Sequence, residues 1–483
     1  MAGLDALVTQ GAGPDTMNTL IHLSRKGAMQ ENKVLRFFYF LLSLFFIVES
    51  AAFAQRVGYS KDEFLRRRNA LMDKVGGGMI VLFGESMPQP VAHFRQDNDF
   101  YYFSGIEDKN AVLLMAPKTK ATYLFLPVRS EETAGEPNLL EEEKAKKEWG
   151  FMDILPLSRF DELAGRNSRW FGLTFYLRFW PPDAVDNSPW EVLTLFARRN
   201  EFHYNDQIPL ENYRVAKLKE RYPALEFKDI GPFIDAMRLI KSAEEIEVLR
   251  RNGRISAEAV KQAMLGTAPG AYEYEIEAEA MHVVLKNGAR GAAYPPIVAS
   301  GPNSCSGEHY TQNSRRVEAG DLVLMDFGAD LDYLCMDITR TWPASGKFTP
   351  EQREVYTIVL EVQKACIEAY RPGVTAKDVQ KHVAEVMEKK GLDSRGLVDE
   401  LRFGFGHGVG MTVHDVGVAG IPLREGIVFA IEPGLYYPEK GFGIRIEDTV
   451  LITKDGCEVL TKDVPKEIDD IEKLLAKRAT TRR

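Results

Sequence analysis

Two aspartates stand inside apolar runs, where an ionised carboxylate is costly to bury. The segment LVLMDFGADLDYLCMDITRT places Asp326 and Asp337 at matching positions in two adjacent strand-like runs. Buried carboxylates need basic partners or a cation, because an apolar interior solvates charge poorly. Either aspartate alone would more often face solvent or cap a turn. The two together favour a shared cation.

A second pair of carboxylates interrupts strand-like runs further along the chain. Glu432 ends the apolar run of IVFAIEPG, and Glu447 lies inside the run of GIRIEDTVLI. Between the two pairs, FGHGVGMTVHD places His407 between glycines, which allow a close approach, and His414 follows it. A single histidine there would more often be an ordinary loop residue. The histidines therefore indicate a metal site only in combination with the carboxylates.

Four carboxylates and one histidine form a hard, oxygen-rich ligand set. Such a set suits two divalent cations of the manganese, cobalt or zinc type better than one structural zinc ion. Carboxylates can bridge two metals about 3.5 to 4 Å apart, which lets a shared water become a hydroxide near neutral pH. The combination predicts a dinuclear metal site formed by Asp326, Asp337, His407, Glu432 and Glu447.

The elements that could position these residues occur twice in the second half of the chain. Each set consists of two helix patterns followed by two strand patterns. The helices are predicted at 242–265, 272–287, 350–370 and 375–390, and the strands at 321–329, 334–341, 427–433 and 443–452. A capping box of Ser242 and Glu245 begins the first helix. The coarse repeat predicts two strand pairs around one central cleft.

An α/β pattern precedes this repeat. Ser60 and Glu63 form a capping box that begins a predicted helix, and the glycines from Gly76 to Gly78 end it. Strands are predicted at 79–83, 111–115 and 122–126, and a charged helix near 139–149. We therefore expect an N-terminal domain over residues 55–238 and a catalytic domain over residues 239–483.

The composition is that of a globular chain with more than one core. The chain has 483 residues, of which 45% are hydrophobic and 27% charged. With 61 basic and 70 acidic residues, the net charge of -9 disfavours nucleic acid and anionic membrane surfaces as partners. The four cysteines lack close-paired spacing, so we expect free thiols, although Cys305 and Cys335 could pair in an oxidising compartment.

Residues 1–54 are predicted to be an N-terminal extension and signal peptide. The apolar run from Phe37 to Val48 is shorter than the about 20 residues that span a bilayer. Basic residues precede it and Ala52-Phe53-Ala54 follows it, which predicts cleavage before Gln55 and an extracytoplasmic protein without a stable membrane span. Met29 is the better start for such a signal. An uncleaved anchor, or a core helix from a wrongly assigned gene start, is the alternative, and an unused signal would leave the protein cytoplasmic.

From about Ser242 onward, the chain resembles the pita-bread metallopeptidases, the family of methionine aminopeptidase, prolidase and aminopeptidase P. MDFGADLDYLCMDITRT, GHGVGMTVHDVG, AIEPGLYYP and GIRIEDTV are long motifs in the family's order, and all five metal-ligand positions match. SGPNSCSGEHYTQN around His309, RQDNDFYYFSGIE from Arg95 and the closing VPKEIDDIEKLL look like aminopeptidase P. The resemblance implies an α/β (α+β) fold, with a creatinase/aminopeptidase P-like N-terminal domain before a pita-bread catalytic domain.

The resemblance also implies an activity, the release of the N-terminal residue from peptides that carry proline in second place. In the implied mechanism, a metal-bridging hydroxide attacks the carbonyl carbon before proline, and Glu432 accepts the proton. Asp326 would be a bidentate ligand, Asp337 and Glu447 would bridge two metals, most simply Mn²⁺, with Co²⁺ or Zn²⁺ as alternatives, and His407 would complete one ion.

Further residues take roles from the same resemblance. His309 and His414 match non-ligand histidines that bind substrate and stabilise the oxyanion. Arg445 and Tyr436 match positions that orient ligands or relay protons, although an ordinary salt bridge and a buried tyrosine would look the same. Tyr101 matches an aromatic that closes a neighbouring subunit's site in a homo-oligomer, whereas an aromatic in an apolar strand is usually core.

Three other functions compete with the aminopeptidase. A prolidase shares the catalytic domain but needs a pocket for the free carboxylate of a dipeptide. A pita-bread protein that has lost its metal can serve as a binding module, and a creatinase-type hydrolase works without metal. The last two normally lack several ligand positions, so the intact set argues against both.

Overall fold

The computed structural model of the chain describes residues 58–86, 94–128, 143–181, 192, 197, 208–306, 310–400, 406–417 and 420–478. The predicted signal segment and His309 lie outside these residues. Within the described ranges, no helix has both the length and the apolar character that a membrane crossing requires. Cys305 and Cys335 are free thiols, as expected.

The N-terminal α/β region is built on a six-stranded mixed sheet with the order β4-β3-β2-β1-β5-β6. Its strands are β1 (Met79–Phe83), β2 (Val112–Ala116), β3 (Ala121–Leu126), β4 (Asp153–Pro156), β5 (Thr174–Leu177) and β6 (Glu226–Asp229). In β1, Ile80 and Leu82 join one apolar cluster, while Met79 and Val81 join another. The sheet is therefore buried on both faces, which explains the nearly continuous apolar sequence of β1.

Helices pack around this sheet, and their ends follow local signals. They are α2 (Lys61–Val75), α3 (Asn98–Ser104), α4 (Glu143–Trp149), α5 (Phe160–Phe171), α7 (Leu210–Arg221) and α8 (Gly231–Arg238). The Ser60 side chain accepts a hydrogen bond from the Glu63 amide at the start of α2, as predicted, and Gly76 ends the helix at φ 73°.

No helix was predicted for the aromatic segment around Tyr101, but the structure has one there. Residues 98–104 form α3, because the Asp97 side chain caps the Phe100 amide and Gly105 supplies the left-handed residue at the other end. All of its residues are buried.

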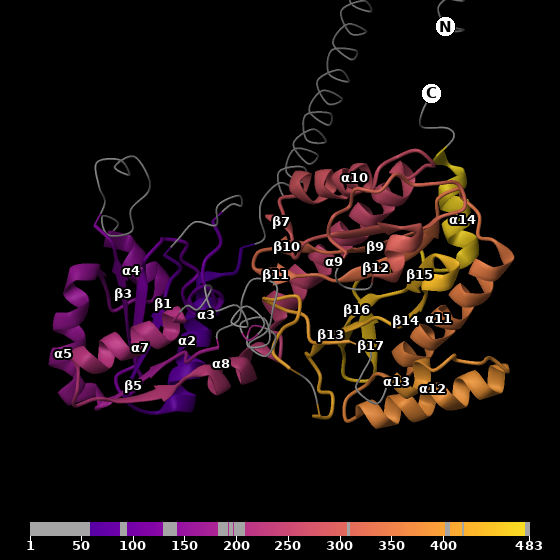
Figure 1. Cartoon of the computed structure of the whole chain (residues 1–483). Coiled ribbons are helices and arrows are strands. Elements are labelled where there is room, and N and C mark those ends of the chain that lie inside the picture. Colours follow the sequence, from indigo (N-terminus) through magenta and orange to yellow (C-terminus); the bar gives the residue numbers. More distant parts are fainter. Residues whose placement is uncertain are drawn as a thin grey trace, which may run out of the picture. The chain divides into compact units, whose positions relative to one another are not determined.

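The catalytic region, which corresponds to the predicted catalytic domain from residue 239 onward, contains the predicted helix pairs. They are α9 (Ala243–Gly266), α10 (Glu273–Lys286), α11 (Pro350–Ala369) and α12 (Ala376–Lys390), with the short α13 (Leu397–Glu400) and the closing α14 (Ile468–Ala476). The capping box of Ser242 and Glu245 is formed in both directions. Helix α9 contacts α10, and α11 contacts α12, so the helices pair as they follow one another in the sequence (Figure 1).

Small antiparallel sheets lie between these helices. Their strands are β7 (Gly291–Ala292), β8 (Ile297–Ser300), β9 (Leu322–Phe327), β10 (Ala329–Leu331), β11 (Leu334–Cys335), β12 (Ile338–Pro343), β13 (Val428–Ile431), β14 (Gly434–Tyr437), β15 (Phe442–Arg445), β16 (Asp448–Ile452) and β17 (Cys457–Val459). The orders are β12-β9-β8, β11-β10-β7, β13-β16-β17 and β14-β15.

Three strands that were predicted to be continuous are broken. The strand predicted at 321–329 is interrupted at Gly328, and each of the other two breaks carries a carboxylate of interest. Asp337 lies between β11 and β12, and Glu447 lies between β15 and β16. The Asp337 amide donates to the Thr449 hydroxyl, and the Glu447 amide donates to the Thr339 carbonyl, instead of continuing one ladder. A break of this kind turns a side chain away from the regular alternation of a strand.

Candidate metal centre

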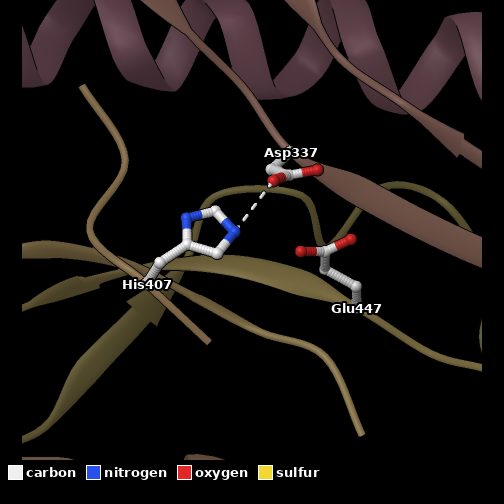
Figure 2. Close-up of side chains that lie close together, drawn as sticks. All are labelled: Asp337, His407 and Glu447. Atoms are coloured by element: carbon white, nitrogen blue, oxygen red, sulfur yellow. Dashed lines mark ion pairs between the residues drawn. The ribbon is translucent and has the colours of Figure 1, made fainter. Parts of the chain in front are cut away.

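Side chains from separate segments converge at these strand breaks. Asp337, His407 and Glu447 each offer a ligand atom, and these atoms lie within 4.8 Å of one another. Figure 2 shows the His407 ring pointing toward Asp337, with the Glu447 carboxylate beside them. His407 Nε2 lies 3.4 Å from Asp337 Oδ2 and 3.4 Å from Glu432 Oε1. Four of the five predicted ligands therefore adjoin one another.

The fifth predicted ligand, Asp326, lies in β9, opposite Thr339 of β12. The Tyr294 hydroxyl lies 2.5 Å from Asp326 Oδ1 and also contacts Asp337 Oδ1. Since a hydroxyl has one proton, it can donate to only one of these carboxylates at a time. The structure thus gathers all five residues in one place, while their role as ligands remains a prediction.

The position of His407 depends on a close approach between two backbones. Its carbonyl accepts a hydrogen bond from the Ala430 amide of β13 at 2.9 Å. A Cβ at Gly406 would lie 2.1 Å from the Ala430 carbonyl oxygen, so only glycine fits there. The His407 Nδ1 atom faces the Gly408 carbonyl at 3.1 Å, which leaves Nε2 toward the carboxylates.

The rest of the segment 406–417 is held by a buried ion cluster. The Asp415 carboxylate accepts from Arg238 Nη2 at 2.7 Å and from Lys241 Nζ at 3.0 Å. A Cβ at Gly410 would lie 1.8 Å from Asp415 Oδ2. Burial raises the pKa of Asp415, but the charges of Lys241 and Arg238 outweigh it and hold this pKa below its usual value.

Two of the clustered carboxylates are poor anions in this environment. Burial raises the pKa of Asp326 to about 7, because the charge of Arg445 offsets burial only in part and Asp337 adds to the rise. Burial, and then the charges of Asp337 and Glu432, raise the pKa of Glu447 well above its usual value. Each group therefore favours its protonated form unless a further positive charge is present.

The pair formed by Asp337 and His407 behaves in the opposite way. Although burial raises the pKa of Asp337, its hydrogen bond to His407 lowers it below the usual value. Burial lowers the pKa of His407, but the hydrogen bond to Asp337 and the charge of Glu432 raise it to about 9. The imidazolium thus takes the place that a cation would take among these carboxylates.

The chemistry of the donors fits divalent cations. Glu447 Oε1 is buried and has no hydrogen-bond partner among the described residues, while Glu447 Oε2 accepts from the Thr339 hydroxyl at 2.7 Å. A buried carboxylate oxygen without a partner is costly, and a cation would satisfy it. Clustered carboxylates with raised pKa values, together with one imidazole, are a donor set for ions such as manganese, cobalt or zinc.

Arg445 connects the two halves of this cluster. Its guanidinium forms an ion pair with Asp326 Oδ2 and donates to the Thr339 hydroxyl at 3.0 Å and to the Tyr436 hydroxyl at 3.0 Å. Arg445 is buried, whereas Tyr436 is 36% exposed, so Tyr436 is not the buried tyrosine of the alternative reading. The arginine therefore orients Asp326 directly and Glu447 through Thr339.

The structure describes only one of the two predicted non-ligand histidines, His414. The His414 ring lies edge-on to that of His407, with 4.0 Å between centroids. His309 is outside the described residues, and described residues before and after it in the sequence contact the buried Glu273. That carboxylate accepts from the Ser300 amide at 2.6 Å, the Tyr310 hydroxyl at 2.5 Å and the Arg315 amide at 2.8 Å.

Tyr101 packs inside its own chain. Its ring stacks on that of Tyr333, with 3.5 Å between centroids and 14° between planes, and its exposed fraction is 9%. This packing agrees with the core alternative for Tyr101. A contact with a neighbouring subunit remains a prediction.

Sequence reasoning missed Tyr294 and Thr339. Nothing in the segment GAAYPP marks the tyrosine as polar or functional, because its hydroxyl meets the aspartates only in the folded chain. Thr339 offered a weak signal, since it follows Asp337 at the spacing that places side chains on the same face of a strand.

Two family models match the sequence. Metallopeptidase family M24 matches residues 247–454, and the N-terminal domain of aminopeptidase P matches residues 64–168. The Xaa-Pro aminopeptidase of Escherichia coli is 34% identical over 456 residues, which are 86% of this chain and 98% of that protein. The Xaa-Pro dipeptidase of Pyrococcus furiosus is 39% identical over 252 residues, which are 51% of this chain and 70% of that protein.

Solved structures of aminopeptidase P are also similar to this chain. Aminopeptidase P from E. coli with the inhibitor Pro-Leu superimposes with a TM-score of 0.71 at 31% identity, over 88% of this chain and 100% of that chain. Proline aminopeptidase P II from Yersinia pestis gives 0.71 at 33% identity, over 86% and 100%. The predicted α/β fold, with an aminopeptidase P-type N-terminal domain before a pita-bread domain, is confirmed. The chain belongs to metallopeptidase family M24.

Proposed function

We propose that this protein is an Xaa-Pro aminopeptidase, which releases the N-terminal residue from peptides with proline in second place. One observation carries the proposal: Asp337, His407 and Glu447 converge within 4.8 Å beside Asp326 and Glu432, in a chain that is similar over most of its length to Xaa-Pro aminopeptidases. A metal centre of this composition suits peptide hydrolysis.

The N-terminal region favours the aminopeptidase over a prolidase. The match to the dipeptidase of P. furiosus covers 51% of this chain, whereas the match to the E. coli aminopeptidase covers 86%. The solved E. coli relative holds the inhibitor Pro-Leu, a dipeptide that begins with proline. Cleavage of an Xaa-Pro-Leu peptide would leave a product of that composition, whereas a dipeptidase releases free proline.

Asp326, Asp337, His407, Glu432 and Glu447 would hold two divalent cations. When bound, such a pair supplies Lewis-acid polarisation and acidifies a water toward neutral pH. Tyr294 and Arg445 keep Asp326 in place, and Thr339 keeps Glu447 in place. The side chains of the cluster thus reach the substrate already oriented, which saves reorganisation during the reaction.

Proton transfer falls to the more accessible members of the cluster. The Glu432 side chain is 18% exposed, against 6% for Asp337, so it can meet a water and the scissile bond. Glu432 accepts the proton of the attacking water at a carboxylate oxygen and passes it to the proline nitrogen that leaves. His414, beside His407, donates to the carbonyl oxygen as negative charge develops there.

Three further assignments belong to this proposal. Mn²⁺ is the proposed metal, because the donors are mostly carboxylate oxygens. The segment Phe37–Val48 with Ala52-Phe53-Ala54 supports export and cleavage before Gln55, which N-terminal sequencing of the mature protein tests directly. Assembly into a homo-oligomer is tested by the mass of the purified protein in solution.

The experiment is a matched peptide series with metal-stripped protein, before and after addition of Mn²⁺. Release of Xaa from Xaa-Pro-Yaa, dependent on metal and absent with Xaa-Ala-Yaa, is the expected result. Cleavage confined to the dipeptide Xaa-Pro would make the protein a prolidase. Tight binding of two metals without turnover of any peptide would overturn the peptidase and leave a binding role.

A further inference from the structure

The hairpin tip between β10 and β11 has an unusual backbone. Asp332 and Tyr333 form its two-residue turn, and both have positive φ, at 50° and 68°. Turns of this shape favour glycine or asparagine, because a side chain at positive φ meets the backbone. A tyrosine there persists only where its surroundings compensate the strain, and such positions concentrate at functional sites.

The N-terminal region supplies that compensation. Tyr333 is fully buried, and its ring stacks on Tyr101 of α3. Its hydroxyl accepts from the Gln96 amide at 2.9 Å and donates to Glu107 Oε1 at 2.8 Å. The Arg95 guanidinium lies 4.8 Å from the centre of the same ring. The hairpin tip of the catalytic region is therefore enclosed by residues 95–107 of the N-terminal region.

Arg95 extends this contact toward the metal centre. Its side chain is buried, and Nε donates to Asp330 Oδ2 of β10 at 2.8 Å. Nη2 donates to the backbone carbonyl of Met411 at 2.9 Å, and Nη1 donates to Asn98 Oδ1. One guanidinium thus joins α3, the hairpin and the segment 406–417.

The hairpin also binds the backbone of the segment 406–417 at Gly410 and Met411. The Cys335 amide donates to the Gly410 carbonyl at 2.7 Å, and its thiol contacts the Met411 carbonyl at 3.7 Å. Cys335 ends β11, just before Asp337, and Gly410 follows His407 in its segment. Arg95 therefore stands where the two segments that carry Asp337 and His407 are tied together.

We infer that Arg95 is a positioning residue through which the N-terminal region sets the separation of Asp337 and His407, and hence the affinity of the centre for divalent cations. Arg95 acts on the proposed ligands indirectly, through the Met411 carbonyl and the Asp330 carboxylate. The inference rests on the proposed metal centre and adds that the catalytic region depends on α3 and its approach for tight metal binding.

Removing Arg95 alone would leave Asp330 as a buried charge without its partner, so the test removes both charges. The variant Arg95→Met/Asp330→Asn has lost the bond to Met411 without stranding a carboxylate. Asp330→Asn alone keeps Arg95 and its bond to Met411. Arg95→Lys keeps the positive charge, but its ammonium group cannot donate to Asp330 and Met411 with the planar geometry of the guanidinium.

Arg67→Met is the matched control. Arg67 is also a buried arginine of the N-terminal region, and it pairs with Glu63 and with Glu245 of the catalytic region. It also donates to a backbone carbonyl, that of Tyr102, at 3.2 Å. None of these bonds reaches the segment 406–417. The Arg67→Met variant therefore measures how a weaker contact between the two regions, away from the segment 406–417, affects Mn²⁺ affinity.

The measurement is Mn²⁺ binding to metal-stripped protein by calorimetry, with the unfolding midpoint of each variant recorded in parallel. We expect the double variant to bind Mn²⁺ about 10- to 100-fold more weakly, as is typical when support of a ligand is lost. Arg95→Lys should fall between it and the wild type. Arg67→Met should bind like the wild type, even where its unfolding midpoint drops. Asp330→Asn should lose less affinity than the double variant, because it keeps the bond from Arg95 to Met411.

Wild-type Mn²⁺ affinity in the double variant would overturn the inference, and so would an equal loss in Arg67→Met. If the double variant does not fold, Arg95→Lys provides the test instead. A wild-type Mn²⁺ affinity in Arg95→Lys would contradict positioning by the guanidinium of Arg95. Failure of the wild type to bind metal or cleave the proline peptides would instead refute the proposed function.

Discussion

The two carboxylate pairs of the centre are treated differently by the protein. Asp326 and Asp337, from the first helix–strand set, meet the Tyr294 hydroxyl, and each also faces a cationic side chain, Arg445 or His407. In the second pair, a buried oxygen of Glu447 has no hydrogen bond from the part of the chain that the structure describes, and Glu432 is the more accessible. The first pair is held by cationic side chains of the protein, whereas the second leaves carboxyl oxygens for a ligand.

The largest expected effect comes from replacing the carboxyl group with the unsatisfied oxygen, that of Glu447. Glu447→Gln should raise the unfolding midpoint of the metal-free protein, because a neutral amide replaces a carboxyl group whose pKa burial raises. The same change should lower kcat/KM by more than the about 10- to 100-fold loss typical of a merely supporting residue. Scanning calorimetry with and without metal, and peptide assays, measure both. Glu458→Gln on the nearby β17 is the control, and a less stable metal-free Glu447→Gln protein would contradict the comparison.

The pH dependence of metal-free stability should be next in size. The raised pKa of Asp326, about 7, means that the folded state holds a proton that the unfolded state releases near pH 4, so stability falls as pH rises between them. The raised pKa of His407, about 9, adds stability that is complete below about pH 6.5 and is lost as pH rises through 9.

Each such proton contributes a slope of about 1.4 kcal/mol per pH unit within its window. Urea unfolding in the presence of a chelator should therefore show higher stability at pH 5 than at pH 9. Asp326→Asn should flatten the lower part of the curve. Saturating Mn²⁺ should reverse the trend, since protons and metal compete for the same groups. A metal-free protein that gains stability with rising pH would contradict these assignments.

A smaller effect is expected from Thr339, which joins the two pairs. Thr339→Val leaves Glu447 Oε2 and Arg445 Nε without their shared partner, and an unsatisfied buried group costs about 1 to 3 kcal/mol. Mn²⁺ affinity should fall about tenfold. Thr341→Val is a close control, because the Thr341 hydroxyl bonds only the Arg445 backbone within the described residues. Equal Mn²⁺ affinities for the two variants would show that Thr339 does not couple the pairs.

The smallest effect should follow loss of the Tyr436 hydroxyl. Tyr436 is 36% exposed, so water can replace its hydroxyl as the acceptor for Arg445 Nη1. Tyr436→Phe should therefore lower kcat/KM by about twofold to tenfold, the worth of one hydrogen bond, without changing Mn²⁺ affinity. A larger loss confined to kcat would give Tyr436 a role in proton transfer.

Local signals explain what could be predicted from the sequence. Helix α2 begins at the Ser60 cap and helix α9 at a complete capping box, and these starts could be predicted without knowledge of the rest of the chain. The return bond from Glu63 that was predicted for α2 is not formed, because the Ser60 amide donates to Glu244 instead. The five candidate ligands could be found because carboxylates inside apolar runs are conspicuous. Their convergence in the structure follows from the repeated order of helices and strands, which brings both strand pairs together.

What could not be predicted depends on contacts between distant segments. The breaks at Asp337 and Glu447 are stabilised by Thr449 and Thr339 of other strands, so the apolar pattern alone suggested continuous strands. The Tyr294 hydroxyl meets its hydrogen-bond partners, Asp326 and Asp337, only in the folded chain. For α3, Asp97 and Gly105 were usable end signals, but the run of aromatic residues favoured a strand.

Glycine-rich sequence is often taken as a sign of backbone mobility, and the segment 406–417 shows why that inference fails here. Gly410 leaves room for the Asp415 carboxylate, which an added Cβ would approach to 1.8 Å, and Lys241 and Arg238 anchor that carboxylate. The glycines make space for neighbours instead of freedom for the chain. Amide hydrogens of Gly410 and Asp415, both bonded within the segment, should therefore exchange with solvent as slowly as those of the core strands.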